Sequence, residues 1–384
     1  MTTTELASDY CTYVTDGTHD SPKAQSQGNY LITSKHLGRY ELDFSSANKI
    51  SEVDYEKIIQ RSAVAQWDIL ISMIGTIGNI YLEVSDTVNY ACKNVGIFKM
   101  GGDEGKAKWL YYYLQSPKAR EYIFTASRGT TQGYIPLNAL RKLPIDVFDD
   151  KTRDEIVAIL WNLDMKIKQN IEINNNLEQQ AQAIYQQMFI GNPNSDWVEG
   201  SLSDIADITM GQSPSGSSYN EDGIGTIFFQ GRAEFGFRFP TIRLYTTEPK
   251  RMACANDTLM SVRAPVGDLN VAHTDCCIGR GLAAIHSKTN HQSFVLYTMF
   301  SLRKQLDVFN GEGTVFGSIN RNSLNDMPIR IPAEEAIEEF ERIVAPMDAA
   351  IRKNYDEICR LQAIRDSLLP RLMSGELDVS DIYL

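Results

Sequence analysis

The segment Gly129-Thr-Thr-Gln-Gly133-Tyr-Ile-Pro-Leu-Asn138 returns 184 residues later as Gly313-Thr-Val-Phe-Gly317-Ser-Ile-Asn-Arg-Asn322. The same offset relates further pairs downstream, namely Leu140 and Leu324, Pro144 and Pro328, Asp164 and Asp348, Ile167 and Ile351, Asn170 and Asn354, Leu177 and Leu361, and Gly191 and Gly375. Upstream, Asp68 and Asp257, and also Gly78 and Gly267, are 189 residues apart. So many matches at a near-constant offset predict an internal duplication. The alternative is two copies of a generic fold with unrelated roles.

The duplication predicts the order domain, helix, domain, helix. We place the first domain at residues 1–150, the first long helix at 151–191, the second domain at 192–332, and the second helix with a C-terminal tail at 333–384. Both domains read as mixed α and β, because β-branched stretches such as 69–74, 226–229 and 258–262 alternate with glycine-rich turns. Short helices are expected at 104–124 and 291–309.

Both long helices show apolar residues at alternating steps of four and three, which is typical of a coiled-coil seam. In the first helix the predicted seam is Ile156, Leu160, Leu163, Ile167, Asn170, Asn174, Leu177, Ala181, Ile184 and Met188. In the second it is Phe340, Val344, Met347, Ile351, Asn354, Ile358, Leu361, Arg365, Leu368 and Leu372. Arg365 is the clear departure from the apolar pattern. The fold class is therefore α/β (α+β), with two pseudo-repeated globular domains separated by a long antiparallel two-helix coiled coil.

Two details of the helices are specific enough to test. Asn170 and Asn354 occupy equivalent seam positions, and a buried Asn fixes register at some cost in stability. In antiparallel helices we expect these two side chains to meet; the alternative is that both face solvent at a bend. The sequence Thr152-Arg-Asp-Glu155 predicts a capping box at the start of the first helix.

Each domain carries a Gly-Thr-x-x-Gly loop and other polar loops whose side chains suit nucleic acid. Paired glycines let the backbone approach a ligand closely, and hydroxyl, amide and guanidinium groups bond phosphates or base edges. The candidates in the first domain are Thr18, His19, Lys23, Lys35, Arg128, Thr130, Thr131, Gln132 and Tyr134. Those in the second are Gln212, Ser213, Ser217, Tyr219, Gln230, Arg232, Arg263, Thr314, Ser318, Asn320 and Arg321. The alternative is that the loops are ordinary turns and the polar residues ordinary surface.

Charge and composition set limits on the function. The formal net charge is -12, but residues 333–384 supply half of it, with 12 acidic and 6 basic side chains. The domains are closer to balance, so each is able to gather its cations on one face. The six cysteines form no C-x-x-C pair, so we expect reduced thiols and no metal site. The start of the chain lacks a signal-peptide pattern and no apolar run spans a bilayer, which indicates a cytoplasmic protein.

The arrangement resembles the specificity subunit of type I restriction-modification systems. The resemblance rests on Asp16-Gly-Thr-His19, on Gly75-Thr-Ile-Gly78 after Asp68, on Gly129 to Pro136, and on the ending Leu368-Leu-Pro-Arg-Leu-Met-Ser-Gly-Glu-Leu377. It implies a chain without catalytic residues, in which two target recognition domains each read one half of a bipartite double-stranded DNA site. It further implies that the helices measure the spacer, and that two methylation subunits, and in some systems restriction subunits, bind the chain.

The resemblance also implies that S-adenosylmethionine and the methylation chemistry belong to the methylation subunit. The sequence agrees in lacking the Asn-Pro-Pro-aromatic motif of adenine methyltransferases, a P-loop and a nuclease motif. Two other functions are possible from the sequence. One is a single-chain enzyme with unrecognised catalytic groups, and the other is a coiled-coil adaptor that binds no DNA.

Overall fold

The computed structural model describes residues 2–128, 133–191, 194, 196–311 and 317–382. The chain divides into two compact units, and each is treated separately below. Unit 1 comprises Met1–Ile171 with Tyr355–Leu384, and unit 2 comprises Glu172–Asn354. Each unit therefore holds one mixed α/β body and a stretch of both long helices.

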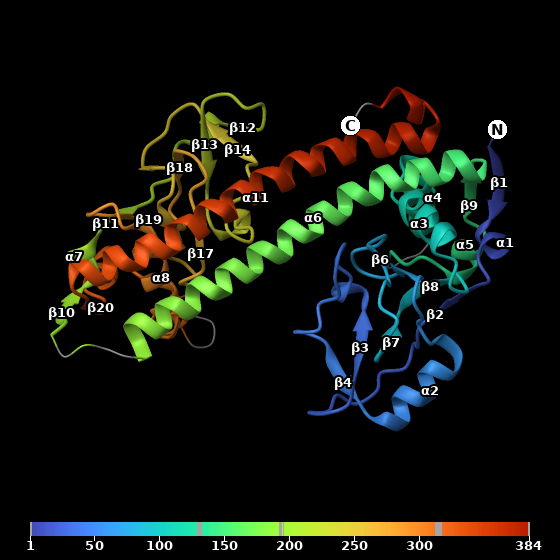
Figure 1. The fold of residues 1–384 in the computed structure, drawn as a ribbon, viewed down its shortest axis with the longest axis horizontal. Coiled ribbons are helices and arrows are strands. Elements are labelled where there is room, and N and C mark those ends of the chain that lie inside the picture. Colours follow the sequence, from blue (N-terminus) through green and yellow to red (C-terminus); the bar gives the residue numbers. More distant parts are fainter. Residues whose placement is uncertain (1, 129–132, 192–193, 195, 312–316, 383–384) are drawn as a thin grey trace. The chain divides into compact units, whose positions relative to one another are not determined.

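The body of unit 1 contains two sheets and a short strand pair (Figure 1). The larger sheet has the order β2-β8-β5-β6, the smaller has the order β4-β3-β7, and β1 pairs with β9. Its elements are β1 (Thr3–Leu6), α1 (Ala7–Tyr10), β2 (Tyr13–Asp16), β3 (Asn29–Thr33), η1 (Ser34–His36), β4 (Asn48–Ile50), α2 (Glu52–Ser62), β5 (Ile69–Ser72), β6 (Ile80–Leu82), β7 (Tyr90–Lys93), β8 (Val95–Lys99), α3 (Glu104–Tyr113), α4 (Pro117–Arg128), α5 (Leu137–Arg141) and β9 (Pro144–Val147).

The body of unit 2 repeats the larger sheet and the short strand pair of unit 1, but its second sheet has five strands in the order β12-β14-β13-β18-β15. The order β11-β19-β16-β17 matches the larger sheet, β13 pairs with β18 in parallel as β3 pairs with β7, and β10 pairs with β20 as β1 pairs with β9. Its elements are β10 (Val198–Ser201), α7 (Leu202–Ile205), β11 (Ala206–Met210), η3 (Gly216–Ser218), β12 (Tyr219–Asn220), β13 (Thr226–Phe229), η4 (Arg232–Glu234), β14 (Leu244–Thr246), β15 (Met252–Ala253), β16 (Thr258–Ser261), β17 (Leu269–Val271), β18 (Cys276–Ile278), β19 (Leu282–Ser287), α8 (Gln292–Ser301), α9 (Arg303–Leu306), η5 (Asp307–Asn310), α10 (Arg321–Asn325) and β20 (Pro328–Ile331).

The fold thus agrees with the duplication predicted from the sequence. The predicted strands 69–74, 226–229 and 258–262 appear as β5, β13 and β16. The predicted helix 104–124 is divided into α3 and α4, because Pro117 has no N–H to continue the first helix. The predicted helix 291–309 is divided similarly into α8, α9 and η5.

The long helices are α6 (Asp150–Tyr185), which continues as a π-helical segment from Gln186 to Gly191, and α11 (Glu334–Ser374). Within each unit the two helices pack antiparallel, since Asp164 contacts Arg365 and Asn170 contacts Glu357 in unit 1. In unit 2, Asn174 likewise contacts Asn354. The capping box predicted at Thr152 is wrong. The helix begins two residues earlier, and the Asp149 carboxylate accepts the Thr152 N–H at 3.1 Å. A short tail with η6 (Val379–Asp381) follows α11.

The predicted seam is buried along most of its length. Buried positions are Ile156, Leu160, Leu163, Ile167, Asn170, Asn174, Ala181, Phe340, Val344, Ile351, Ile358, Arg365 and Leu372. Leu177, Ile184, Met188, Met347, Asn354, Leu361 and Leu368 are only half-buried. At the end of α6 and in the π-helical segment that follows it, Tyr185 and Phe189 are buried, one position after the predicted Ile184 and Met188. A helix of 3.6 residues per turn drifts past a 3.5-residue pattern, which accounts for this shift.

The predicted pairing of Asn170 with Asn354 is wrong. The Asn354 side-chain amide donates to Asn174 Oδ1 at 2.9 Å, and the Asn174 amide donates to the Ile351 carbonyl at 3.2 Å. Asn170 donates instead to the Glu357 carboxylate at 2.8 Å. Polar seam residues therefore fix the register of the helices in each unit, with partners other than those expected.

A buried aspartate from a long helix anchors each body. In unit 1, Asp164 accepts hydrogen bonds from the Tyr40 hydroxyl at 2.8 Å, the Tyr112 hydroxyl at 2.9 Å and the Arg365 guanidinium at 2.8 Å. Burial raises the pKa of both phenols, so both hydroxyls remain donors. The seam position that departed from the apolar pattern, Arg365, is thus the buried ion-pair partner of Asp164.

Unit 2 has an equivalent buried aspartate, but its arginine partner comes from the body and not from a long helix. Asp348, the equivalent of Asp164, accepts from the Tyr297 hydroxyl at 2.9 Å and lies 3.4 Å from the guanidinium of Arg238. Arg238 comes from the body of the unit, at the position that Tyr40 occupies in unit 1. Ala181 stands where Arg365 would be expected by the repeat. Each unit thus holds one body rigidly against its helices, through different residues.

Candidate nucleic-acid interface

The loops that carry the predicted residues of unit 2 leave one end of its four-stranded sheet. β11 and β16 end there and β19 begins there, because both run antiparallel to β19. The Gly211 N–H donates to the Leu282 carbonyl at 2.9 Å, and the Val262 N–H donates to the Gly281 carbonyl at 2.9 Å. Gln212, Ser213 and Arg263 therefore follow strands that end side by side.

Two further loops join at the same place. The Gly279 N–H donates to the Phe229 carbonyl at 2.8 Å, which brings Gln230 to this end. The Ala264 N–H donates to the Gly317 carbonyl at 2.9 Å, and Arg263 forms an isolated antiparallel bridge with Ser318. We call residues 211–213, 230–231, 262–264, 279–281 and 317–319 the unit 2 loop end. It gathers five predicted residues, namely Gln212, Ser213, Gln230, Arg263 and Ser318.

Glycines allow these loops to pack so closely. A Cβ atom added to Gly211 would lie 2.1 Å from the Gly279 carbonyl oxygen. A Cβ atom on Gly279 would lie 2.8 Å from the Gln230 carbonyl oxygen. Neither distance is possible without movement of the backbone. Close approach of backbone segments is a common reason for glycine at a fixed position.

Arg280 is the functional candidate that the sequence interpretation missed in unit 2. It is exposed between Gly279 and Gly281, and its N–H donates to Ser213 Oγ at 3.2 Å. The guanidinium groups of Arg263 and Arg280 form no ion pair with another described residue, so both are available to a ligand. The glycine–arginine–glycine sequence directly after a strand is the signal that could have identified it.

Other predicted residues of unit 2 have structural contacts of their own. Arg232 lies 2.5 Å from Asp268, which also pairs with Arg303 at 2.7 Å. The Tyr219 ring packs 4.9 Å from Phe228, and its hydroxyl donates to the Pro214 carbonyl. Asn320 caps α10 through the Ser323 N–H. Ser217 is exposed and bonded to Ser215, Arg321 is exposed at the start of α10, and Thr314 lies outside the described residues.

Unit 1 has an equivalent loop end, at residues 17–21, 34–35, 73–74, 93–95 and 133–135. The Thr18 N–H donates to the Cys92 carbonyl at 2.9 Å, and the Asn94 N–H donates to the Thr18 carbonyl at 3.1 Å. The Ser34 hydroxyl donates to the Asn94 carbonyl at 3.2 Å, which positions the neighbouring Lys35. Ile74 bridges to Tyr134, as Arg263 bridges to Ser318 in unit 2.

The predicted residues of unit 1 divide into exposed and structural groups. His19 is exposed, and its ring nitrogens lie 2.8 Å from Asn94 Oδ1 and 2.9 Å from Asp16 Oδ2. Lys23 and Lys35 are exposed and Tyr134 is half-buried. Thr18 is 9% exposed and its hydroxyl accepts the Asp20 N–H, so it shapes the turn. The Arg128 side chain, Thr130, Thr131 and Gln132 lie outside the described part of the structure.

Arg61 and Lys57 of α2 were missed because they are distant in sequence from the loop that they face. Arg61 donates to the carbonyl oxygens of Asp16 at 3.2 Å and Gly17 at 2.7 Å. Together with His19 and Ser21 they line a hollow of about 510 Å³ beside the loop end. No pattern within α2 itself distinguishes these cations from ordinary surface residues.

Other site classes find no support within the described residues. No group of three or more His, Cys, Asp or Glu side chains there is arranged to hold a metal ion. None of the helices in the described ranges has the length and apolarity needed to cross a membrane. All six cysteines are free thiols, with Cys254 and Cys359 exposed and the others buried.

Comparison with known proteins agrees with this architecture. The model of the type I restriction modification DNA specificity domain matches twice, at residues 23–179 and 194–358. The chain therefore belongs to the family of type I restriction-modification specificity subunits, which supply DNA specificity and contain no catalytic centre of their own. The two matches coincide with the two halves of the duplication.

Individual relatives resemble the chain over most of its length. A protein of Methanocaldococcus jannaschii named as the MjaX specificity subunit of a type I restriction enzyme is 28% identical over 374 residues, covering 89% of this chain and 87% of that protein. The HindI specificity subunit of Haemophilus influenzae is 23% identical and covers 83% of this chain and 88% of its own. The crystal structure of the S subunit from M. genitalium is 14% identical, covers 97% and 96% of the two chains, and has a TM-score of 0.59.

Proposed function

We propose that each unit reads one half of a bipartite double-stranded DNA target through its loop end. The observation that carries this proposal is the equivalence of the two loop ends. Four-stranded sheets of the same strand order present polar loops at the same strand ends, and in unit 2 two arginines there have no ionic partner among the described residues. Arginine reads guanine through two hydrogen bonds in the major groove, and exposed lysine neutralises phosphates.

We further propose the roles of the remaining parts. The bodies at residues 1–150 and 192–332 act as target recognition domains, while the helical parts at 151–191 and 333–384 act as spacers. Two methylation subunits bind the chain and carry S-adenosylmethionine, and restriction subunits join in some assemblies. The specificity subunit then contributes recognition and positioning, because methylation of a base within a duplex requires a flipped base in the partner's active site.

Selection from random duplexes tests the proposal. The assembled complex of this chain with its methylation subunits is incubated with a random duplex pool, and the bound DNA is sequenced. We expect enrichment of two short sequences separated by unread positions of constant length. Enrichment of one uninterrupted sequence, or no enrichment in any assembly, would contradict the proposal. The first outcome would exclude two separate readers, and the second would favour an adaptor role.

Substitution of one glycine tests the loop end of unit 2. We expect Gly211→Ala to reduce affinity for the selected target by roughly tenfold or more, because its Cβ must displace the 279–281 loop that holds Arg280. Gly216→Ala is the matched control, because Gly216 lies outside the unit 2 loop end and a Cβ there meets no atom within 4 Å. Fluorescence anisotropy with the selected duplex gives the affinities. Equal affinities for the two variants would show that the packing of these loops does not determine binding.

A further inference from the structure

The two units differ where each body faces its long helices. Unit 2 contains a pocket of about 390 Å³ between its body and α11, whereas the hollow at the equivalent place in unit 1 measures about 30 Å³. The two places are equivalent by the repeat offset of 184 residues. The pocket of unit 2 is lined by Ala345, Asp348 and Ala349, and the hollow of unit 1 is lined by their respective equivalents Trp161, Asp164 and Met165.

The size difference follows from two substitutions. In unit 1 the indole of Trp161 and the side chain of Met165 fill the space, and the Lys108 ammonium lies 4.0 Å from the centre of the indole ring. In unit 2 both positions are alanine, and both alanines are exposed. Unit 1 thus shows that this place accommodates a flat bicyclic ring, while unit 2 leaves the same place open.

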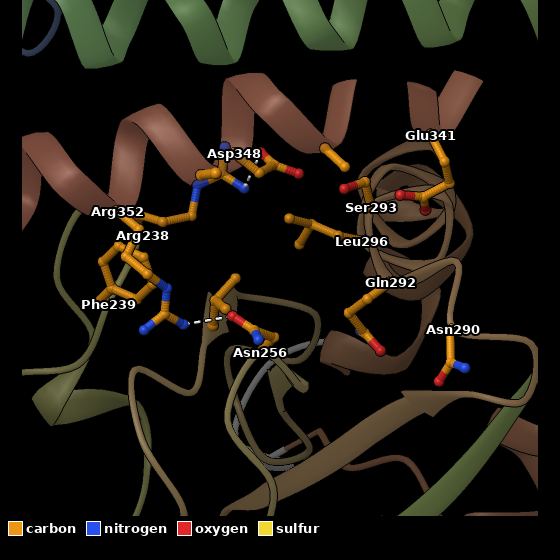
Figure 2. A pocket seen from close by; sticks show the side chains of 13 residues that line it. Arg238, Phe239, Asn256, Asn290, Gln292, Ser293, Leu296, Glu341, Asp348 and Arg352 are labelled. Atoms are coloured by element: carbon orange, nitrogen blue, oxygen red, sulfur yellow. Dashed lines mark hydrogen bonds and ion pairs between the residues drawn. The ribbon is translucent and has the colours of Figure 1, made fainter. Parts of the chain in front are cut away.

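The walls of the pocket are chemically distinct (Figure 2). Arg238, Phe239, Asn256 and Arg352 lie on one side, and the Arg352 guanidinium is 5.1 Å from the centre of the Phe239 ring. Glu341, Gln292 and Asn290 lie on the other side. The Phe239 ring is 3% exposed and lies under the Arg352 guanidinium, so a flat ring would stack on the guanidinium face. The Glu341 carboxylate on the opposite side can receive N–H groups of such a ring.

Three polar groups at the pocket are held at a cost that a ligand would offset. Arg238 is 4% exposed, and its Nε–H has no hydrogen-bond acceptor among the described residues. A buried donor without a partner costs free energy. Burial also raises the pKa of Glu341 and of Asp348, since both carboxylates are removed from water. A ligand with both a hydrogen-bond acceptor and an N–H donor would satisfy these groups.

We propose that this pocket binds a small bicyclic heteroaromatic molecule of the indole or purine class. Its ring occupies the space that Trp161 fills in unit 1, its N–H faces Glu341 or Asp348, and an acceptor atom faces Arg238. A free molecule fits better than a side chain of a partner subunit. If two copies of a partner subunit bound the two units alike, a side chain of the copy on unit 2 could enter the pocket. The same side chain of the copy on unit 1 would be blocked by Trp161.

The test uses the full-length chain with indole and adenine as probes. Isothermal titration calorimetry is expected to show one site per chain for at least one probe, and that probe is expected to raise the unfolding temperature. Ala345→Trp is expected to weaken binding at least tenfold and to raise the unfolding temperature without a probe, because its ring fills the pocket. Ala363→Trp, at an exposed position of the same helix, is expected to leave binding unchanged.

The outcomes separate the alternatives. Failure of both probes to bind at about 1 mM would overturn the proposal, and so would equal binding by the Ala345→Trp and Ala363→Trp variants. If neither probe binds but Ala345→Trp prevents assembly with the methylation subunit, the pocket belongs to a subunit contact and the small-molecule proposal is wrong. The DNA-selection result does not depend on any of these outcomes, so the two proposals fail independently.

Discussion

Replacing Arg365 with methionine is expected to lower the free energy of unfolding of unit 1 by about 3 kcal/mol. The change keeps much of the side-chain volume but leaves the Asp164 carboxylate, which is 1% exposed, without the guanidinium that lies 2.8 Å away. The hydroxyls of Tyr40 and Tyr112 and the more distant Arg39, at 3.5 Å, remain as partial compensation. Urea unfolding followed by circular dichroism measures the loss.

Two further variants make this result specific. Asp366→Ala removes the exposed partner of the same arginine, so we expect a loss of less than about 1 kcal/mol. Combining Asp164→Leu with Arg365→Met is expected to recover part of the loss, because no unpaired charge remains buried. If Arg365→Met is no more destabilising than Asp366→Ala, the buried pair does not hold the body of unit 1 against its helices.

Lengthening both long helices is expected to change the distance between the two half-targets without changing their sequences. Four strong helix formers inserted after Ile171 and four after Asn354 extend the antiparallel pair at the boundary of the units. Four residues add about 6 Å and about 40° of rotation to a helix. One to two base pairs of DNA add about 3.4 to 7 Å, with a comparable rotation. The unread spacer should therefore grow by one or two base pairs.

Methylation mapping of DNA from cells that carry the complete system shows the outcome. Insertion into only one helix is the matched control. It is expected to reduce stability rather than change the spacer, because the contact of Asn174 with Asn354 and that of Asp164 with Arg365 no longer fit one register. An unchanged spacer in the doubly extended chain would show that these helices do not measure the target.

The duplication and the seam could be read from sequence because they are periodic. Identical residues at a fixed offset predicted two bodies of one topology, and the two four-stranded sheets follow it, whereas the second sheet has three strands in unit 1 and five in unit 2. The seam prediction lost accuracy near Ile184 because a pattern of 3.5 residues was extended beyond the point where a straight helix turns away from it. Contacts between helices depend on their relative shift, which no single helix sequence contains, so the partners of Asn170 and Asn354 were not predictable.

The sequence predicted candidate site residues only where they closely follow strands whose ends meet in the fold. Gln212 and Arg263 closely follow neighbouring strands of the four-stranded sheet, which brings them together. Gln230 follows β13 of the other sheet and joins them through the hydrogen bond from the Gly279 N–H to the Phe229 carbonyl. Arg61 reaches the unit 1 loop end from a helix more than forty residues away in sequence, and only the tertiary structure places it there. The guanidinium of Arg232 is suited to DNA, but it forms an ion pair with Asp268. This pair depends on a contact between loops that are distant in sequence, so the residues around Arg232 do not predict it.

The most direct measurement of the central claim is the effect of single arginines on each half of the target. Duplex selection is repeated with complexes carrying Arg263→Ala or Arg280→Ala in unit 2, Arg128→Ala in unit 1, or the exposed control Arg330→Ala on β20. We expect the unit 2 variants to relax one half-sequence only, Arg128→Ala to relax the other half only, and the control to alter neither. Equal relaxation of both halves by any one of these arginines would contradict independent reading by the two units.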